Sequence, residues 1–414
     1  MTRNTSISAD TKSILLLCGV LGKSARARIL TQSEYTVLVR HLIKTGLRPG
    51  DLLEASDLTQ IALGARIDPD RFSNLLSRGV QLGFALEEWE RNGIWVVSRG
   101  EQEYPERMKK HLGEKAPPLL FCIGNPDLLA GGGVAVVGSR NVDEKGKLFA
   151  RRVAKQCALE NLPVVSGGAR GVDQTAMLAC IESGGDCIGI VSDSLLRHSL
   201  EHNARKAISD GRLLLLSPYH PEAGFSVGNA MARNKLIYAM AQYAVVVSAE
   251  TGKGGTWTGA REELARSIHR QVFVRIEEGV PTGNRTLIEL GAEKWPEAGS
   301  NLAETLVSLG KAGRETNAAI QNDLFGNMSS AAQARETARP YAAAGSAGED
   351  TKLSSSVFQA VMPLILERLD SPKSGNQLAD ELKVTRNQMS IWLKLAIQQG
   401  VIRKLQKPVR YTRA

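Results

Sequence analysis

The sequence is poor in cysteine: its five cysteines are scattered along 414 residues and form no CxxC pair. Such a set provides neither a disulfide framework nor a cysteine zinc site, and it is typical of a reducing compartment. No apolar run reaches the roughly 18 residues of a membrane span. The shorter run at 13–21 has flanks that favour a buried helix over a secretion signal. We therefore expect a cytoplasmic protein without a membrane partner.

Catalytic and metal-binding motifs are also missing. The chain contains no GxxxxGK[ST] loop, no GxGxxG after its first expected central strand, no HExxH and no Cys/His cluster. These absences argue against a P-loop nucleotidase, a dinucleotide-dependent enzyme and a zinc hydrolase. His198 and His202 have i,i+4 spacing, which as a lone pair indicates a solvated helix face. We expect no metal, no cofactor and no enzymatic activity.

The length allows two or three domains, and four regions differ in pattern. Residues 1–95 have helical periodicity, and 96–310 contain alternating strand and helix signals. Residues 311–352 are rich in Ala, Gly, Ser, Thr, Asn and Gln, which predicts a flexible linker. Residues 353–414 are helical again and carry ten Lys/Arg against four Asp/Glu. The whole chain has a net charge of +9, which mildly favours a polyanionic partner.

The central region contains short apolar runs of strand length separated by helical stretches. Continuously apolar strands alternating with helices indicate a parallel sheet covered on both faces. Right-handed crossovers then give a Rossmann-like arrangement. We predict an α/β fold, an extended Rossmann-like parallel sheet with an N-terminal helical region and a C-terminal winged helix. The expected strands are 134–137, 163–165, 187–191, 213–216, 244–247 and 272–274.

Three strand-to-helix turns are rich in glycine and carry basic or hydroxyl residues. Ligands of open parallel sheets bind beyond the carboxyl ends of the strands, where helix N-termini attract anions and arginine grips phosphate. Three such turns together predict a phosphate-binding rim. Its candidates are Gly138, Ser139 and Arg140 after the first strand, Ser166, Gly167, Gly168, Arg170 and Gly171 after the second, and Lys253, Gly254, Gly255 and Thr256 after the fifth.

Several motifs, in family order over residues 104–292, resemble the DprA/Smf DNA-processing family. They are Tyr104-Pro105, PPLLFCIG at 117–124, GSR at 138–140, SGGARGVD at 166–173, Arg233-Asn234-Lys235 and Gly283-Asn284. The resemblance implies an extended Rossmann fold, binding of single-stranded DNA, a homodimer, and loading of a RecA-type recombinase. It leaves transformation, recombination and defence against foreign DNA as alternative settings. Lys235 departs from the common family pattern, in which a second arginine is usual.

The resemblance also implies roles for individual residues. Arg140, Arg170, Arg233 and Lys235 would contact DNA phosphates, with Asn234 in the same motif. The turn formed by Gly254, Gly255 and Thr256 would complete the anion pocket. On physical grounds, Phe225 and Trp257 are candidate platforms on which bases stack, and the alternative for each is a place in the core.

The linker contains the pentapeptide QNDLF, with Gln321, Leu324 and Phe325. It resembles the short peptides that dock in the hydrophobic pocket of the bacterial replication sliding clamp. Two adjacent apolar residues in a polar stretch suit such a ligand. The alternatives are a chance pentapeptide and a pair that packs back on the body of the protein.

The C-terminal region predicts a winged helix-turn-helix, with helices at 357–369, 374–382 and 386–399. Leu378, Ala379 and Leu382 face inward on the second helix, and Met389, Leu393 and Ala396 on the third. Thr385 and Gln388 are spaced for a capping box. The module either contacts DNA or docks a protein. The candidate DNA contacts are Arg386, Asn387 and Lys394 on the third helix and Arg403 and Lys404 in the wing.

Two other functions remain open beside the leading one, a non-catalytic protein that binds single-stranded DNA. Gly254-Gly255-Thr256, with Glu262-Glu263 beyond, is similar to the motif of Rossmann-type nucleotide phosphoribohydrolases, although the threonine-to-glutamate spacing is longer. The other alternative is a nucleotide-sensing or antitoxin-like regulator that uses the C-terminal module on a promoter.

Overall fold

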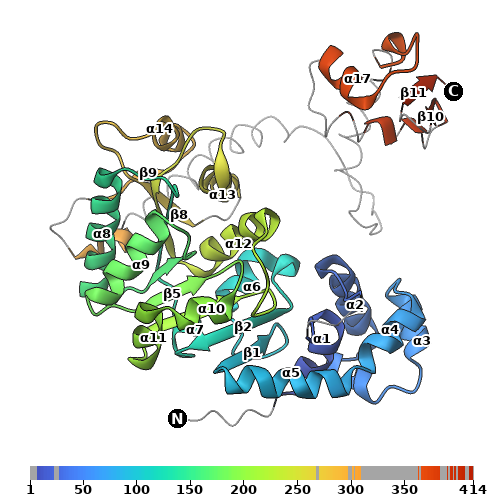
Figure 1. Cartoon of the computed structure of the whole chain (residues 1–414), viewed down its shortest axis with the longest axis horizontal. Coiled ribbons are helices and arrows are strands. Elements are labelled where there is room, and N and C mark those ends of the chain that lie inside the picture. Colours follow the sequence, from blue (N-terminus) through green and yellow to red (C-terminus); the bar gives the residue numbers. More distant parts are fainter. Residues whose placement is uncertain are drawn as a thin grey trace, which may run out of the picture. The chain divides into compact units, whose positions relative to one another are not determined.

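The computed structural model divides the chain into two compact units, Met1–Phe325 and Gly326–Ala414, which we describe separately (Figure 1). The structure describes residues 7–22, 28–266, 270–296, 301–302 and 304–308 of the first unit. Of the second unit it describes residues 362, 365–382, 389, 392–394, 396–397, 400–405 and 410–413.

The first unit begins with helices that pack around one buried helix. In α1, the side chains of Ile14, Leu15 and Leu17 are fully buried, which confirms the predicted buried helix. The last helix of this group packs on the sheet through Trp89, whose ring lies edge-to-face on Phe121 with a centroid separation of 5.0 Å. The elements are α1 (Ala9–Cys18), α2 (Gln32–Thr45), η1 (Pro49–Leu53), α3 (Leu58–Gly64), α4 (Pro69–Leu76) and α5 (Gly79–Arg91).

The centre of the first unit is a mostly parallel sheet, which in the described residues has nine strands in the order β1-β2-β6-β5-β4-β3-β7-β8-β9. Only the pairs β1–β2 and β2–β6 are antiparallel. The Rossmann-like sheet is thus confirmed, and the antiparallel edge extends it. The strands are β1 (Ile94–Ser98), β2 (Leu119–Gly124), β3 (Val134–Gly138), β4 (Val164–Ser166), β5 (Cys187–Ile190), β6 (Leu213–Ser217), β7 (Tyr243–Ser248), β8 (Gln271–Val274) and β9 (Glu293–Lys294).

Helices cover both faces of the sheet. Successive residues of each strand point to opposite faces, so each face has its own core cluster. One core cluster joins Val134 and Val136 of β3 to α8 and α9, and it continues into the N-terminal helices. A second cluster joins Ala135 and Val137 to the helices of the other face (Figure 1). The helices are α6 (Glu106–Leu112), η2 (Gly113–Lys115), α7 (Leu128–Gly131), α8 (Glu144–Leu159), α9 (Val172–Glu182), α10 (Leu195–Leu200), α11 (His202–Ser209), α12 (Val227–Met240), α13 (Gly254–Leu264) and α14 (Thr282–Glu289).

The strand order reverses beside β3. From β3 the chain adds β4, β5 and β6 on one side, and then α12 carries it back to β7 on the other side. In open α/β sheets a ligand crevice forms at such a reversal, beyond the carboxyl ends of the strands. The fold therefore places the turns after β3, β4 and β7 where a ligand site is expected.

The second unit contains α17 (Gly375–Glu381) and an antiparallel hairpin of β10 (Ile402–Leu405) and β11 (Arg410–Arg413). Ser374 and Gln377 form a capping box that begins α17. Residues predicted to face inward are buried, namely Leu378, Ala379, Met389, Leu393 and Ala396. The capping box expected at Thr385 and Gln388 lies outside the described residues. The winged helix and the three boundaries between the four predicted regions stay predictions.

Candidate nucleic-acid interface

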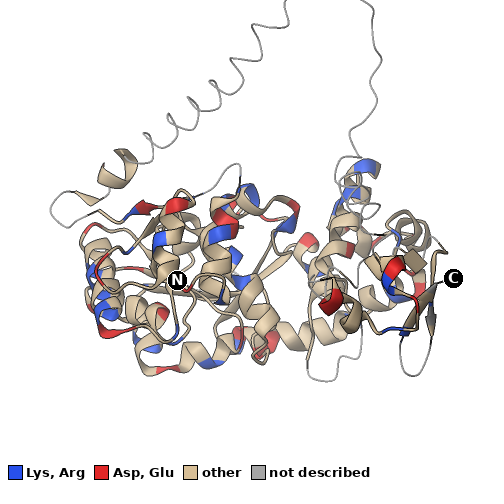
Figure 2. Ribbon diagram, turned by 90° about the horizontal axis from the view of Figure 1, so that it is seen from above, with Lys and Arg blue, Asp and Glu red and all other residues tan. Residues whose placement is uncertain are grey.

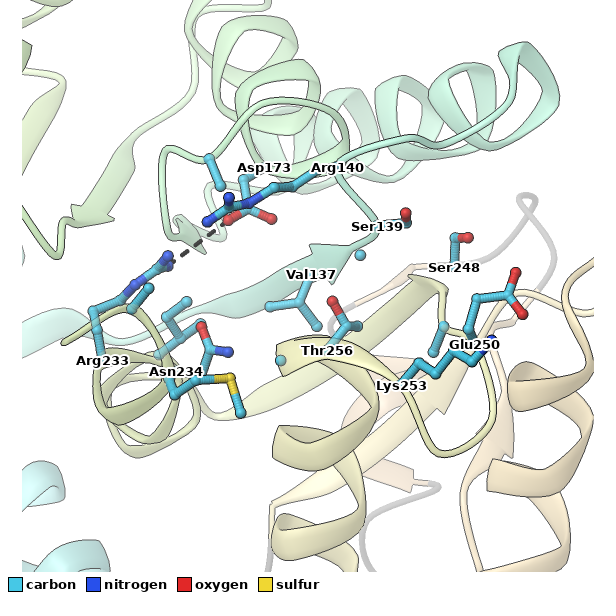
Figure 3. Close-up of a pocket in the computed structure, with 18 of the residues that line it drawn as sticks. Val137, Ser139, Arg140, Asp173, Arg233, Asn234, Ser248, Glu250, Lys253 and Thr256 are labelled. Atoms are coloured by element: carbon cyan, nitrogen blue, oxygen red, sulfur yellow. Dashed lines mark ion pairs between the residues drawn. The ribbon is translucent and has the colours of Figure 1, made fainter. Parts of the chain in front are cut away.

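A cavity of about 430 Å³ opens where the strand order reverses. Its lining comes from the turns after β3, β4 and β7, from α12, and from the first turn of α13 (Figure 3). This volume lies within the range of small-ligand sites, about 300–1,000 Å³. Segments more than 100 residues apart in sequence, such as Ser139 and Thr256, thus share one site.

Backbone contacts join the three turns. The Ser139 amide donates to the Ser248 carbonyl at 3.0 Å, and the Val172 amide donates to the Ser139 carbonyl at 3.4 Å. Gly171 has φ of 92°, and a side chain there would collide with the carbonyl groups of Ser139 and Arg140. The glycine is therefore required for the close approach of the first two turns.

The Asn284 side chain fixes the turn after β7. It is fully buried, its Oδ1 accepts from the Ala249 amide at 2.8 Å, and its Nδ2 donates to the carbonyls of Val247 at 3.1 Å and Arg275 at 2.8 Å. Buried polar groups are stable only when paired in this way. Asn284 itself does not line the cavity, but it positions the residues of β7 and its turn that do.

Most of the predicted phosphate-binding residues meet in this cavity. Those that line it are Gly138, Ser139, Arg140, Arg233, Asn234, Lys253, Gly254, Gly255 and Thr256. Phe225, predicted as a stacking platform, lines it as well.

The rim of the cavity offers positive charge and free amides. Arg140 is exposed, and its guanidinium lies 5.5 Å from the centroid of the Phe225 ring, which is itself 56% exposed. Helix α13 begins at Lys253 without a side-chain cap, whereas Asp143 caps α8 through the Gly146 amide. Lys and Arg elsewhere are interspersed with Asp and Glu (Figure 2). The rim suits an anion because uncapped helix amides and an arginine face it.

The floor of the cavity contains a buried ion pair. Arg233 and Asp173 are 4% and 6% exposed, and Arg233 Nη1 lies 3.7 Å from Asp173 Oδ2 (Figure 3). Burial lowers the pKa of the Arg233 guanidinium and raises the pKa of the Asp173 carboxyl, and in each case the charge of the partner opposes the shift. Among the described residues, Nε and Nη1 of Arg233 have no hydrogen-bond partner.

Other predicted residues of these motifs lie outside the cavity. Ser166 is buried and donates to the Val136 carbonyl at 2.7 Å, so its hydroxyl supports β3 and β4. Arg170 is exposed and donates to Asn141 Oδ1 at 2.6 Å. Gly167, Gly168 and Gly171 shape the turn after β4 without lining the cavity.

Three suggested roles are not supported by position. Trp257 is 6% exposed within the core, so its ring has no free face on which a base could stack. Lys235 Nζ pairs with Glu262 Oε2 at 3.1 Å, and both side chains are half-exposed away from the cavity. Glu263 is buried against His111. The two glutamates suggested for a phosphoribohydrolase therefore do not reach the glycine-rich turn.

Sequence reasoning did not assign to the site four polar residues that line the cavity, Asp173, Tyr238, Ser248 and Glu250. Asp173 was visible as the single acid that ends the SGGARGVD motif. Tyr238 follows Asn234 by four residues and so shares its face of α12. No local signal indicated Glu250, whose backbone pairs with that of Lys253 in an isolated antiparallel β-bridge.

The remaining candidates belong to the linker and the second unit. Gln321, Leu324, Phe325, Arg386 and Asn387 lie outside the described residues, as does the side chain of Lys404. Lys394 and Arg403 are exposed.

The described residues contain neither a metal-binding cluster of His, Cys, Asp and Glu nor a helix long and apolar enough to span a bilayer. His198 pairs with Glu201, its Nδ1 lying 3.0 Å from Oε1.

The fold and the site define a Rossmann-like protein with a cavity at its strand ends, lined by Arg140 and Lys253 among other residues. A sequence profile of the family described as DNA recombination-mediator protein A matches residues 95–306, about half of the chain. The chain belongs to this family, the DprA/Smf family.

Known relatives agree with this assignment. The chain is 34% identical to DNA processing protein DprA of Streptococcus pneumoniae over 196 residues, 46% of this chain and 67% of the relative. It is 26% identical to DprA of Bacillus subtilis over 190 residues, 45% of this chain and 62% of that protein. The crystal structure of the S. pneumoniae protein matches with a TM-score of 0.55 and 25% identity, covering 70% of this chain and 94% of the other.

Proposed function

We propose that the chain binds single-stranded DNA at this cavity and assists the loading of a RecA-type recombinase onto the strand. The observation that carries the proposal is the convergence of Arg140, Lys253 and the uncapped start of α13 on one open cavity beside exposed Phe225. Binding of single strands without sequence preference requires cationic groups along the backbone and an aromatic face for bases. Membership of a recombination-mediator family supports the recombinase step.

In this proposal the rim holds the sugar–phosphate backbone. Arg140 and the first amides of α13 contact phosphate oxygens, and Lys253 adds charge. The exposed Phe225 ring stacks against a base, with the Arg140 guanidinium on one side of it. Arg170 on the neighbouring turn extends the cationic surface beyond the cavity.

Replacement of Arg140 tests the proposal. We expect Arg140→Ala to weaken binding of a 5′-labelled oligothymidylate roughly tenfold, because a charge-assisted phosphate contact is lost. The slope of log affinity against log salt should decrease by about 0.7 for each phosphate contact removed. Fluorescence anisotropy over a salt series measures both. Recombinase filament formation on strands coated with single-strand-binding protein should slow in parallel.

Arg205→Ala is the matched control, since Arg205 is exposed on α11 and does not line the cavity. It should leave affinity and salt slope unchanged. If Arg140→Ala binds as tightly as the unaltered protein with the same salt slope, the cavity is not the DNA site.

A further inference from the structure

The floor of the cavity contains buried polar atoms without hydrogen-bond partners among the described residues, although one of them, Arg233 Nη1, is in an ion pair with Asp173. Arg233 is 4% exposed, and its Nε and Nη1 make no hydrogen bond within the described part of the chain; the same holds for the hydroxyl of Tyr238, which is 2% exposed. Both side chains belong to α12 and line the same cavity. Buried donors are rarely left unpaired in native proteins, so two in one cavity point to a ligand that completes them.

The positive charge of Arg233 is paired with a negative one at the floor, and the charge of Arg140 also acts on both members of this pair. Asp173 Oδ2 lies 3.7 Å from Arg233 Nη1, so the guanidinium charge is already matched by a carboxylate. A phosphate placed against Arg233 would meet this carboxylate in a desolvated space, which disfavours two like charges. A neutral group with both donors and acceptors suits the pair better.

The walls above the floor are largely apolar, with Val137, Ile237, Met231 and Ala249 among the lining residues. A ligand for this shape has apolar faces and a polar edge. A nucleobase has that form, since its faces are apolar and its edge carries donors and acceptors.

The absence of a side chain at Gly167 leaves room for Arg233 to lie inward. A Cβ at residue 167 would overlap the Arg233 guanidinium, so the guanidinium lies directly against the Gly167 backbone. The guanidinium thus lies at the floor, against the turn after β4.

We infer that the floor of this cavity accepts one nucleobase of a bound single strand, with Arg233, Asp173 and Tyr238 along its polar edge. The phosphates of that nucleotide remain at the rim beside Arg140. This inference rests on the proposed binding of single-stranded DNA, and it assigns Arg233 to a base instead of a phosphate.

The test compares two oligonucleotides of equal length, one of thymidylate and one whose residues are all abasic. Arg233→Gln should weaken binding of the thymidylate strand about tenfold and leave binding of the abasic strand unchanged. Tyr238→Phe removes only the unpartnered hydroxyl and should weaken the thymidylate strand about fivefold, again with no effect on the abasic strand. Affinity is measured by competition against a labelled strand.

Arg140→Ala is the matched rim variant and should weaken both strands by the same factor. The test compares the effect of each variant on the two strands, not the two affinities themselves. An abasic strand has no base to stack on Phe225, so even the unaltered protein binds it more weakly than the thymidylate strand. Thermal unfolding of each variant confirms folding, and Tyr238→Phe remains informative if Arg233→Gln fails to fold.

Equal loss on both strands for Arg233→Gln would overturn the inference, because Arg233 would then contact the backbone. Unchanged thymidylate binding by folded Arg233→Gln and Tyr238→Phe would also overturn it, while the proposed function would stand. Failure of the unaltered protein to bind either strand would overturn both.

Discussion

At the scale of single residues, Gly167 is the position at which one methyl group has the clearest consequence. The φ angle of Gly167 is not in the left-handed region, so alanine is compatible with its backbone, but a Cβ would overlap the Arg233 guanidinium. We expect Gly167→Ala to displace this side chain and weaken oligothymidylate binding about tenfold while the protein stays folded. Anisotropy and thermal unfolding measure the two effects.

The matched control is Gly83→Ala in α5, where a Cβ would meet nothing within 4 Å. This change should leave binding unaltered and raise stability by roughly 0.5–1 kcal/mol, because alanine is the better helix former. Binding by Gly167→Ala equal to that of the unaltered protein would show that the position of Arg233 is unimportant for DNA.

Single residues of the site were predictable where they stand in local motifs. Gly138 to Arg140 and Lys253 to Thr256 follow apolar strands directly, and the structure brings them to one cavity. The pairing of Arg233 with Asp173 was not predictable, because it depends on how α12 packs over the turn after β4, about 60 residues earlier in the chain. The burial of Trp257 was not predictable either, because its core cluster is formed by segments that are distant in the sequence.

At the scale of elements, the start of α2 depends on one carboxylate. Thr31 and Glu34 form a capping box, and Arg71 of α4 donates to Glu34 from Nη1 at 2.7 Å and from Nη2 at 3.1 Å. Chiefly through the Arg71 hydrogen bonds, the pKa of Glu34 falls from 4.5 to about 2. The ionised carboxylate thus stabilises the fold above about pH 5, and this contribution is lost as the pH falls toward about 2.

We expect Glu34→Gln to lower the free energy of unfolding of the N-terminal helices by at most about 3 kcal/mol at neutral pH. The loss relative to the unaltered protein should shrink as the pH falls from about 5 to about 3. Denaturant unfolding at several pH values measures this.

Glu87→Gln is the control for that measurement, since Glu87 pairs with Arg91 on the exposed face of α5. It should cost about 0.5 kcal/mol or less. A Glu34→Gln protein whose stability deficit is the same at every pH would contradict the role of the ionised carboxylate.

Elements with strong local patterns were predictable, as the agreement of the central strands indicates. The antiparallel strands β1 and β2 were not, because β1 pairs with β2 and β2 in turn pairs with β6, about 90 residues further along the chain. Strand pairing of that kind depends on packing that no local pattern encodes.

At the scale of the whole molecule, the two units have separate hydrophobic cores. Among the described residues, the clusters of the first unit include nothing beyond residue 306, and the cluster of the second unit comes entirely from 362–411. Since apolar burial is the main stabilising contribution, each unit contains the residues that stabilise it. The composition of 311–352 predicts a linker between them.

A chain ending at Phe325 should therefore retain the unfolding transition of the first unit and bind a short oligothymidylate within about twofold of the full chain. The reason is that every lining residue of the cavity belongs to the first unit. Calorimetry and anisotropy on both chains measure these outcomes. A loss of tenfold or more in a folded truncated chain would place the principal DNA contacts in the second unit, where Lys394 and Arg403 are exposed.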